Sequence, residues 1–398
     1  MKRILKSALY LLLATTLVVA CSNDEPQPTH PAPTPETPQP LTESHTLLIY
    51  MQGNNGLAEF MDSNLQRIIS AYYNIDNDNA RVFIFYDRGN YTRLTELYMN
   101  DGMAKQRLIE EYTTSTSTVD KDFMAAVFAQ VKELAPADSY GLILSSHGGG
   151  WVPADLYDVY LIGEGSRAEE PQASPLFYGQ DDYDCMEIPD LVDAINAMHF
   201  NYIIFDACFM GNVEALYDMR SSADYIIASP AEVLGAGFPY ETMLPMLFEY
   251  EGHQLEEICE EYMAYYEGSS ATVTLVDCAK FDALAAAMHK VIATGNEANV
   301  DIDALQAFDN FDAHLYLDLG HYVEQIATDE ALKEFNKALK EVVIFTDHTS
   351  SLFTSTGSVE TIAVERSSGF TTYVKQDGCP VTYAEWLKTA WAKAIGAK

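Results

Sequence analysis

Short apolar runs that alternate with helix-like segments constrain the fold of this 398-residue chain more than any other feature of its sequence. The runs are almost entirely apolar and rich in isoleucine and tyrosine, which is typical of strands buried on both faces of a sheet. They lie at 46–51, 81–86, 140–146, 202–205 and 225–228. Between them, the segments 122–134 and 188–198 repeat apolar residues at helical spacing. This succession predicts an α/β fold in which helices flank a mostly parallel central sheet.

Two reactive side chains follow the third and fourth runs, at the end of a parallel sheet where binding sites form. His147 and three glycines come directly after the third run, and Cys208 comes shortly after the fourth. A helical pattern at 210–220 predicts a helix N-terminus close to Cys208, which favours the thiolate nucleophile. His147 is suited to take and return the thiol proton, and the glycines allow backbone N–H groups to reach a substrate carbonyl. The pair predicts nucleophilic catalysis, and the alternative is a surface histidine and a packed cysteine that share no role.

Motifs that the chain lacks argue against two other kinds of site, an esterase site and a metal site. HGGG after a strand is also the oxyanion motif of lipases and esterases, but that fold needs a G-x-S-x-G elbow downstream, and the chain has none. The chain also has no C-x-x-C pair and no H-E-x-x-H, so no metal site is predicted from these patterns. The composition of the chain argues against a nucleic-acid-binding protein. Such a protein needs a basic surface, whereas here Asp and Glu outnumber Lys and Arg by 59 to 23. The net charge of −36 is compatible with a basic substrate, but a soluble, self-repelling surface is the simpler explanation of it.

The first 44 residues are predicted to export and anchor the chain. Residues 1–20 combine three basic residues with an apolar run too short to span a bilayer, as in a secretory signal peptide. The run ends at Cys21 in a sequence that resembles a bacterial lipobox, and residues 21–44 form a proline-rich tether. Asp24 and Glu25 resemble the surface-export signal of Bacteroidetes-type lipoproteins. We therefore expect a lipid on Cys21 and an outer-membrane lipoprotein exposed at the cell surface; the alternative is an ordinary signal peptide with a chance cysteine.

Residues 139–151 and 205–220, which contain His147 and Cys208, resemble the histidine and cysteine motifs of the clostripain family of cysteine peptidases. Further family-like segments occur in the same order at 47–57, 81–89, 223–229, 237–240, 316–326, 369–374 and 383–391. The resemblance implies a caspase-like fold with a C-terminal α+β subdomain. We expect a catalytic region at 45–250 and a subdomain at 251–398 that completes the fold.

The resemblance also implies the roles of individual residues. His147 and Cys208 match the catalytic dyad, and the backbone N–H groups of Gly148 and Cys208 match the oxyanion hole. Asp206 matches the acid that recognises Arg or Lys at the cleavage position, whereas a strand-end cap is its structural alternative. Many relatives have a second acid where this chain has Ala236, so Glu232 is the candidate to replace it. The expected function is therefore a lipid-anchored cysteine endopeptidase acting on basic peptide sites through a thioester; the alternative is a non-catalytic surface binding lipoprotein that keeps the fold.

Two further expectations concern cofactors and self-cleavage. No cofactor is expected to be required; the cluster at 181–184 is a candidate calcium site, and a solvated acidic loop is the simpler interpretation. Arg167 is the only basic residue between His147 and Cys208, in a segment rich in turn residues. Because relatives are cut after a basic residue in this region, we expect self-cleavage between Arg167 and Ala168. The alternative is that Arg167 is an ordinary solvated loop residue.

Overall fold

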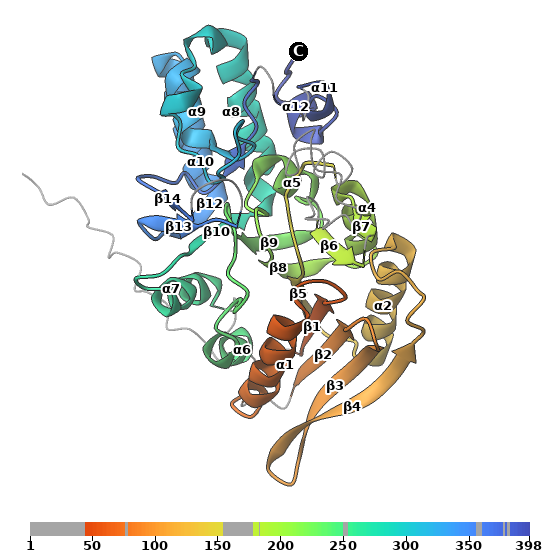
Figure 1. The fold of residues 1–398 in the computed structure, drawn as a ribbon. Helices are drawn as coiled ribbons and strands as arrows, with labels where there is room; N and C mark the ends of the chain where they lie inside the picture. Colours follow the sequence, from red (N-terminus) through yellow and green to blue (C-terminus); the bar gives the residue numbers. More distant parts are fainter. Residues whose placement is uncertain are drawn as a thin grey trace, which may run out of the picture. The chain divides into compact units, whose positions relative to one another are not determined.

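The computed structural model describes residues 44–75, 79–153, 178–182, 184–249, 254–355, 360–376, 379 and 383–398. All of them belong to one compact unit, residues 39–398 (Figure 1). Within these residues, nine strands form a central sheet in the order β12-β10-β9-β8-β5-β1-β2-β3-β4. The strands are β1 (His45–Gln52), β2 (Ala80–Asp87), β3 (Thr92–Asn100), β4 (Met103–Tyr112), β5 (Ser139–Ser145), β8 (Phe200–Asp206), β9 (Ala223–Ala228), β10 (Thr272–Asp277) and β12 (Val343–His348).

The five runs identified in the sequence become β1, β2, β5, β8 and β9, and these are the parallel strands at the middle of the sheet. Antiparallel strands complete both edges: β3 and β4 pair beyond β2, and β10 and β12 pair beyond β9. The expected mostly parallel sheet is therefore confirmed. Strands β10 and β12 come from the part of the chain after residue 250, and they extend the same sheet.

Helices cover both faces of the sheet, because alternate residues of each buried strand point to opposite sides. In β1, Leu48 and Tyr50 join one core with α2, α4, α5 and α8, whereas Leu47 and Ile49 join another with α1, α6 and α7 (Figure 1). These helices are α1 (Ala58–Tyr72), α2 (Lys121–Leu134), α4 (Ile188–Ile195), α5 (Val213–Asp218), α6 (Tyr240–Glu249), α7 (Leu255–Tyr265) and α8 (Phe281–Thr294). The result is three layers, with the sheet buried between two sets of helices.

The remaining described elements are short pieces and the helices of the C-terminal part. They are the strand pairs β6 (Tyr178–Asp181) with β7 (Asp184–Met186), β11 (Leu317–Asp318) with β15 (Thr371–Thr372), and β13 (Ser351–Phe353) with β14 (Thr361–Ala363); the 3-10 turns η1 (Cys278–Lys280), η2 (Glu297–Asn299) and η3 (Ile302–Ala304); and the helices α9 (Leu319–Ile326), α10 (Asp329–Val342), α11 (Tyr383–Trp386) and α12 (Ala390–Ala394). Of the helices that the structure describes, none has both the length and the apolar character needed to cross a membrane.

One helix near the predicted site is shorter than its sequence pattern. The pattern at 210–220 predicts a helix that begins close to Cys208, but α5 begins only at Val213. Two interactions make the helix start later in the chain. The N–H of Gly211 donates to the Ser229 carbonyl over 2.7 Å, and the side chain of Asn212 caps α5 by accepting from the N–H of Ala215. Cys208 therefore lies in a turn between β8 and α5, and the expectation that a helix N-terminus directly supports it is wrong.

Candidate active site

The pairing of β5 with β8 brings the two predicted catalytic residues to the same end of the sheet. The strands are parallel neighbours, and their register places Ser145 opposite Asp206. His147 and Cys208 each lie two residues beyond this pair. Both side chains are partly exposed, in contrast to the strand residues before them.

The backbone segments that follow the two strands are in direct contact. A methyl group added to Gly148 would lie 2.6 Å from the carbonyl oxygen of Cys208 and 3.0 Å from Cβ of Ala207. Only glycine allows so close an approach without displacing the backbone. The segment after β5 is also fixed by a hydrogen bond of 2.9 Å from the N–H of Gly179 in β6 to the His147 carbonyl. The predicted oxyanion residues, Gly148 and Cys208, therefore lie against one another.

The turn that carries Cys208 is held by a neighbouring loop. Phe209, the next residue, has a positive φ of 56°, which is uncommon for a bulky side chain and costs free energy. Its N–H donates to the Ala231 carbonyl over 2.9 Å, and the N–H of Val233 donates to Sγ of Cys208 over 3.2 Å. The loop after β9 thus fixes both the strained turn and the position of the thiol.

Tyr316, which the search for catalytic residues missed, connects the two sides of the site. Its hydroxyl donates to the Gly149 carbonyl over 2.5 Å, and its ring stacks on Phe209 with 4.2 Å between ring centroids. Tyr316 is fully buried. It stands at the start of the family-like segment 316–326, but nothing in that segment indicates which residue packs against the dyad. One buried side chain therefore contacts both the glycine segment after His147 and the turn after Cys208.

Although both residues keep part of their surface exposed, the loss of water around their ionisable atoms controls the protonation of both candidate catalytic groups. Burial raises the pKa of the Cys208 thiol to about 12, with a smaller contribution from the negative charge of Glu232, while the Val233 N–H opposes the shift. Burial also lowers the pKa of His147 to about 4. At neutral pH the thiol and the imidazole are therefore both uncharged in this state. The expected lowering of the Cys208 pKa by a helix N-terminus is not found, because α5 begins too far along the chain.

Asp206 is a buried acid at the end of β8, 7% exposed. Its Oδ2 accepts hydrogen bonds from the hydroxyls of Tyr240, at 2.7 Å, and Ser145, at 3.3 Å. Burial raises the pKa of Asp206 to about 6, although both hydroxyls and the charge of Arg67 oppose the shift. A methyl group on Gly237 would lie 2.5 Å from Oδ2, so the loop after β9 also passes directly over the carboxylate.

Arg67 of α1 is a positive charge that acts on this acid, and it was not identified from the sequence. Its Nη1 donates to the Ala236 carbonyl over 2.6 Å, and its Nε donates to Glu241 over 2.8 Å. The guanidinium carbon lies 5.8 Å from the centre of the Tyr240 ring, whose hydroxyl binds Asp206. An internal cation therefore contacts the position where many relatives have a second acid. No local pattern could reveal it, because Arg67 and Asp206 are far apart in the chain.

Glu232, the other predicted substrate-binding acid, is engaged by the protein itself. The side chain is 8% exposed. Its two carboxylate oxygens accept hydrogen bonds of 2.6 to 3.1 Å from the hydroxyl and N–H of Ser355 and from the hydroxyl of Thr354. These contacts join the loop beside Cys208 to the segment after β13. The arrangement gives Glu232 a structural function in this state of the chain.

In the acidic cluster at 181–184, the protein itself engages the carboxylate of Asp181. Asp181 accepts hydrogen bonds from the Asn54 side chain at 2.7 Å and from the N–H of Thr118 at 2.7 Å, so both its oxygens are already bound. Among the described residues, no group of three or more His, Cys, Asp or Glu side chains is placed to hold a metal ion. Cys21, Arg167 and Ala168 lie outside the described residues.

Comparisons with known proteins identify relatives of this chain and of its fold. The family model described as "Clostripain family" matches residues 49–393. The structure is similar to an inactive zymogen C11 protease from Parabacteroides distasonis, with a TM-score of 0.78 and 28% identity over 89% of this chain and 99% of that chain. It is also similar to a secreted C11 cysteine protease from Bacteroides thetaiotaomicron in complex with an irreversible peptide inhibitor, with a TM-score of 0.76 and 27% identity over 88% of this chain and 98% of that chain.

Clostripain from Hathewaya histolytica is 24% identical over 231 residues, which are 49% of this chain. The chain spans 40% of the length of that relative. Together with the two solved structures, these matches confirm the expected α/β fold with a caspase-like, mostly parallel sheet.

The raised pKa of Cys208 predicts how fast the thiol is alkylated in the uncut chain. The reaction with iodoacetamide needs the thiolate, so its rate at Cys208 should rise about tenfold per pH unit from pH 7 to 10 without a plateau. Peptide mass mapping of Arg167→Ala protein at each pH measures this rate for Cys208 alone. A small free thiol in the same buffer, with a pKa of about 8.5, is the control and should level off. A plateau at Cys208 near neutral pH would instead show a thiolate already paired with a charged His147.

Proposed function

The chain belongs to the clostripain family of cysteine proteases, and we propose that it is an endopeptidase in which Cys208 is the nucleophile and His147 the general base. The observation that carries this proposal is the pairing of β5 with β8, which brings both residues to one end of the sheet in matching register. The neutral imidazole of His147 is in the protonation state that a base requires.

In the proposed reaction, Sγ of Cys208 attacks the carbonyl carbon of the substrate as its proton moves to His147. The N–H groups of Gly148 and Cys208 stabilise the oxyanion, a role supported by the contact between their backbones. The tetrahedral intermediate collapses to a thioester, and the leaving amine takes the proton from His147. Water then attacks the thioester with His147 as base, which releases the acid and restores the thiol.

The dyad predicts the effect of two substitutions. Cys208→Ala should lower kcat on a peptide substrate by about a thousandfold or more, and His147→Ala should cost nearly as much, because the two groups act as a unit. Cys185, a partly exposed cysteine in β7 that has no role in the proposed dyad, offers the matched control. Cys185→Ala should keep its activity, and all three variants should keep the wild-type circular dichroism spectrum. Wild-type turnover by folded Cys208→Ala protein would refute the assignment.

We further propose that Asp206 gives the enzyme a preference for Arg or Lys at the cleavage position. The acid lies two residues before the nucleophile, and a carboxylate binds a guanidinium or ammonium group by charge-assisted hydrogen bonds. Arg67 offsets part of this charge, and the acid is buried in the uncut chain. Access of a substrate to Asp206 therefore requires the surrounding loops to open.

The raised pKa of Asp206 gives this preference a pH dependence. Burial gives Asp206 a pKa of about 6 in the uncut chain. If the active enzyme keeps this environment before substrate binds, the kcat/KM ratio of an arginine substrate to its uncharged citrulline analogue should rise about tenfold from pH 5 to pH 7. Taking a ratio cancels the titration of the dyad. In Asp206→Asn protein the ratio should be low and independent of pH, whereas Glu232→Gln should keep the wild-type profile. The reverse result, a flat profile in Glu232→Gln only, would assign the preference to Glu232.

Cleavage at the Arg167–Ala168 bond is the proposed route to the open enzyme. The protonated thiol and the buried Asp206 are properties of a resting state, and a similar protein is described as an inactive zymogen. Wild-type protein should be cut after Arg167 during purification, and the Cys208→Ala and Arg167→Ala chains should stay whole. Intact-mass analysis distinguishes these outcomes. A fully active wild-type chain that remains uncut, or equal cutting of Cys208→Ala protein, would contradict the proposal.

We propose that a lipid on Cys21 holds the protein at the outer membrane, with the catalytic unit outside the cell. The support is the sequence of residues 1–44 alone. Cys21→Ser should move the protein from the membrane fraction to the soluble fraction, because the acyl chains would be lost. Membrane retention of the variant would exclude the lipid anchor.

A further inference from the structure

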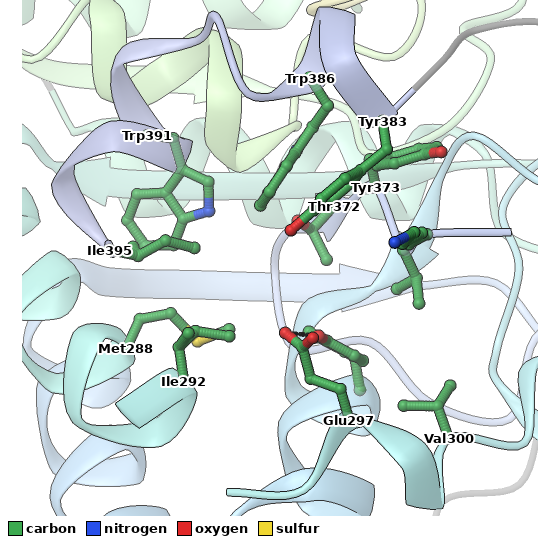
Figure 2. Close-up of a pocket in the computed structure, with 13 residues that line it drawn as sticks. Met288, Ile292, Glu297, Val300, Thr372, Tyr373, Tyr383, Trp386, Trp391 and Ile395 are labelled. Atoms are coloured by element: carbon green, nitrogen blue, oxygen red, sulfur yellow. Dashed lines mark hydrogen bonds between the residues drawn. The ribbon is translucent and has the colours of Figure 1, made fainter. Parts of the chain in front are cut away.

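A cavity in the C-terminal part of the chain lies among residues that have no role in the proposed reaction. It encloses about 130 Å³ between α8, η2 and α9 on one side and residues 372–375, α11, α12 and Ile395 on the other (Figure 2). Five aromatic side chains contribute to its lining: Tyr322, Tyr373, Tyr383, Trp386 and Trp391. An apolar cavity of about 150 Å³ holds benzene, so this cavity of about 130 Å³ is close to the size that a single six-membered ring needs.

The two tryptophans of the cavity differ in the hydrogen bonding of their indole N–H groups. Trp386 donates to Oε1 of Glu214 over 2.7 Å. Trp391 is completely buried, and its Nε1 has no hydrogen-bond partner among the described residues. Figure 2 shows the edge of the Trp391 ring that carries Nε1 facing into the cavity. A buried donor without a partner costs free energy, so Trp391 favours an occupant that supplies an acceptor.

The opposite wall supplies an acceptor. The carboxylate of Glu297 points into the cavity in Figure 2 and accepts a hydrogen bond of 3.3 Å from the Tyr322 hydroxyl. Glu297 and Lys375 both line the cavity and are both exposed to solvent, so one acid and one base lie where the cavity meets the surface. The Nζ of Lys375 lies 4.8 Å from the centre of the Tyr383 ring and already makes a cation–π contact. The balanced charge and the apolar interior favour a neutral ligand.

A fixed set of hydrogen bonds preforms the cavity. Oε1 of Glu214, which is fully buried in α5, accepts from Trp386, from the Thr372 hydroxyl at 2.6 Å and from the Tyr373 N–H at 3.1 Å. Three lining residues therefore have fixed positions before any ligand arrives. Preformed walls reduce the entropic cost of binding.

We propose that this cavity is a second binding site that takes a phenol-like group. A phenol has one six-membered ring for the aromatic and aliphatic walls. Its hydroxyl can accept the hydrogen bond that the Trp391 N–H offers, and its proton can be donated to the exposed Glu297 carboxylate. The group comes either from a free aromatic molecule or from a tyrosine side chain of a polypeptide, because both present the same chemistry.

The indole N–H of Trp391 provides a direct test. The chain has three tryptophans, so wild-type protein labelled with ¹⁵N-tryptophan gives three indole resonances, and Trp391→Phe identifies the one from Trp391. Titration with p-cresol should shift that resonance saturably, with a dissociation constant of about 1 mM or lower. The resonance of Trp386, which is already bonded to Glu214, serves as the internal control and should move less.

Matched ligands and variants separate the contribution of the hydroxyl group to binding from that of the ring. Toluene lacks the hydroxyl and should bind about fivefold to tenfold more weakly than p-cresol, a difference that Trp391→Phe should reduce. Ile292→Phe fills the cavity from α8 and should abolish binding of both ligands. Binding of N-acetyltyrosinamide as well as p-cresol would assign the site to tyrosine side chains, and binding of p-cresol alone would assign it to free molecules. Absence of saturable p-cresol binding, equal affinity for toluene, or unchanged binding to Ile292→Phe protein would overturn the proposal.

Discussion

The parallel hydrogen bonding between β5 and β8 is the interaction on which the candidate site depends. Because Ser145 pairs with Asp206, the residues two positions further along both strands emerge at the same level of the sheet. A shift of the register by one residue would place every side chain of β8 on the opposite face and separate the two reactive groups. The fully buried residues on both faces of these strands prevent such a shift, since each face contributes to a different core.

Beyond the strands, contacts between distant segments hold the two proposed catalytic residues in place. The bare Cα of Gly148 allows the backbone after β5 to touch the Cys208 carbonyl, and Tyr316 packs against both sides. The loop after β9 fixes the thiol through Val233 and covers Asp206 at Gly237. The same loop is therefore in contact with the nucleophile and with the proposed specificity acid. A cut in the chain that moves this loop would change the protonation of Cys208 and the access to Asp206 together.

The sequence predicted the strands at the middle of the sheet, and it placed His147 and Cys208 after two neighbouring strands, because both predictions depend on short, local patterns. Strands buried on two faces are continuous apolar runs, whereas β3 and β4 at the edge are partly exposed and contain many polar residues, so they lack that pattern. The length of α5 was overestimated because the Asn212 cap and the Gly211 contact depend on chain segments that the pattern does not include. Arg67, Tyr316 and the pairing of Glu214 with Trp386 were not predictable, since each joins residues more than a hundred positions apart.

The central claim is that Cys208 and His147 form one catalytic unit at the end of β5 and β8. Covalent labelling of the active enzyme with an irreversible peptidyl inhibitor that has arginine next to its reactive group tests this claim most directly. The account predicts one label per inactivated chain, located on Cys208 by peptide mass mapping, and no label in His147→Ala protein under the same conditions. Complete inactivation with the label on any other residue, or unchanged labelling of Cys208 without His147, would contradict it.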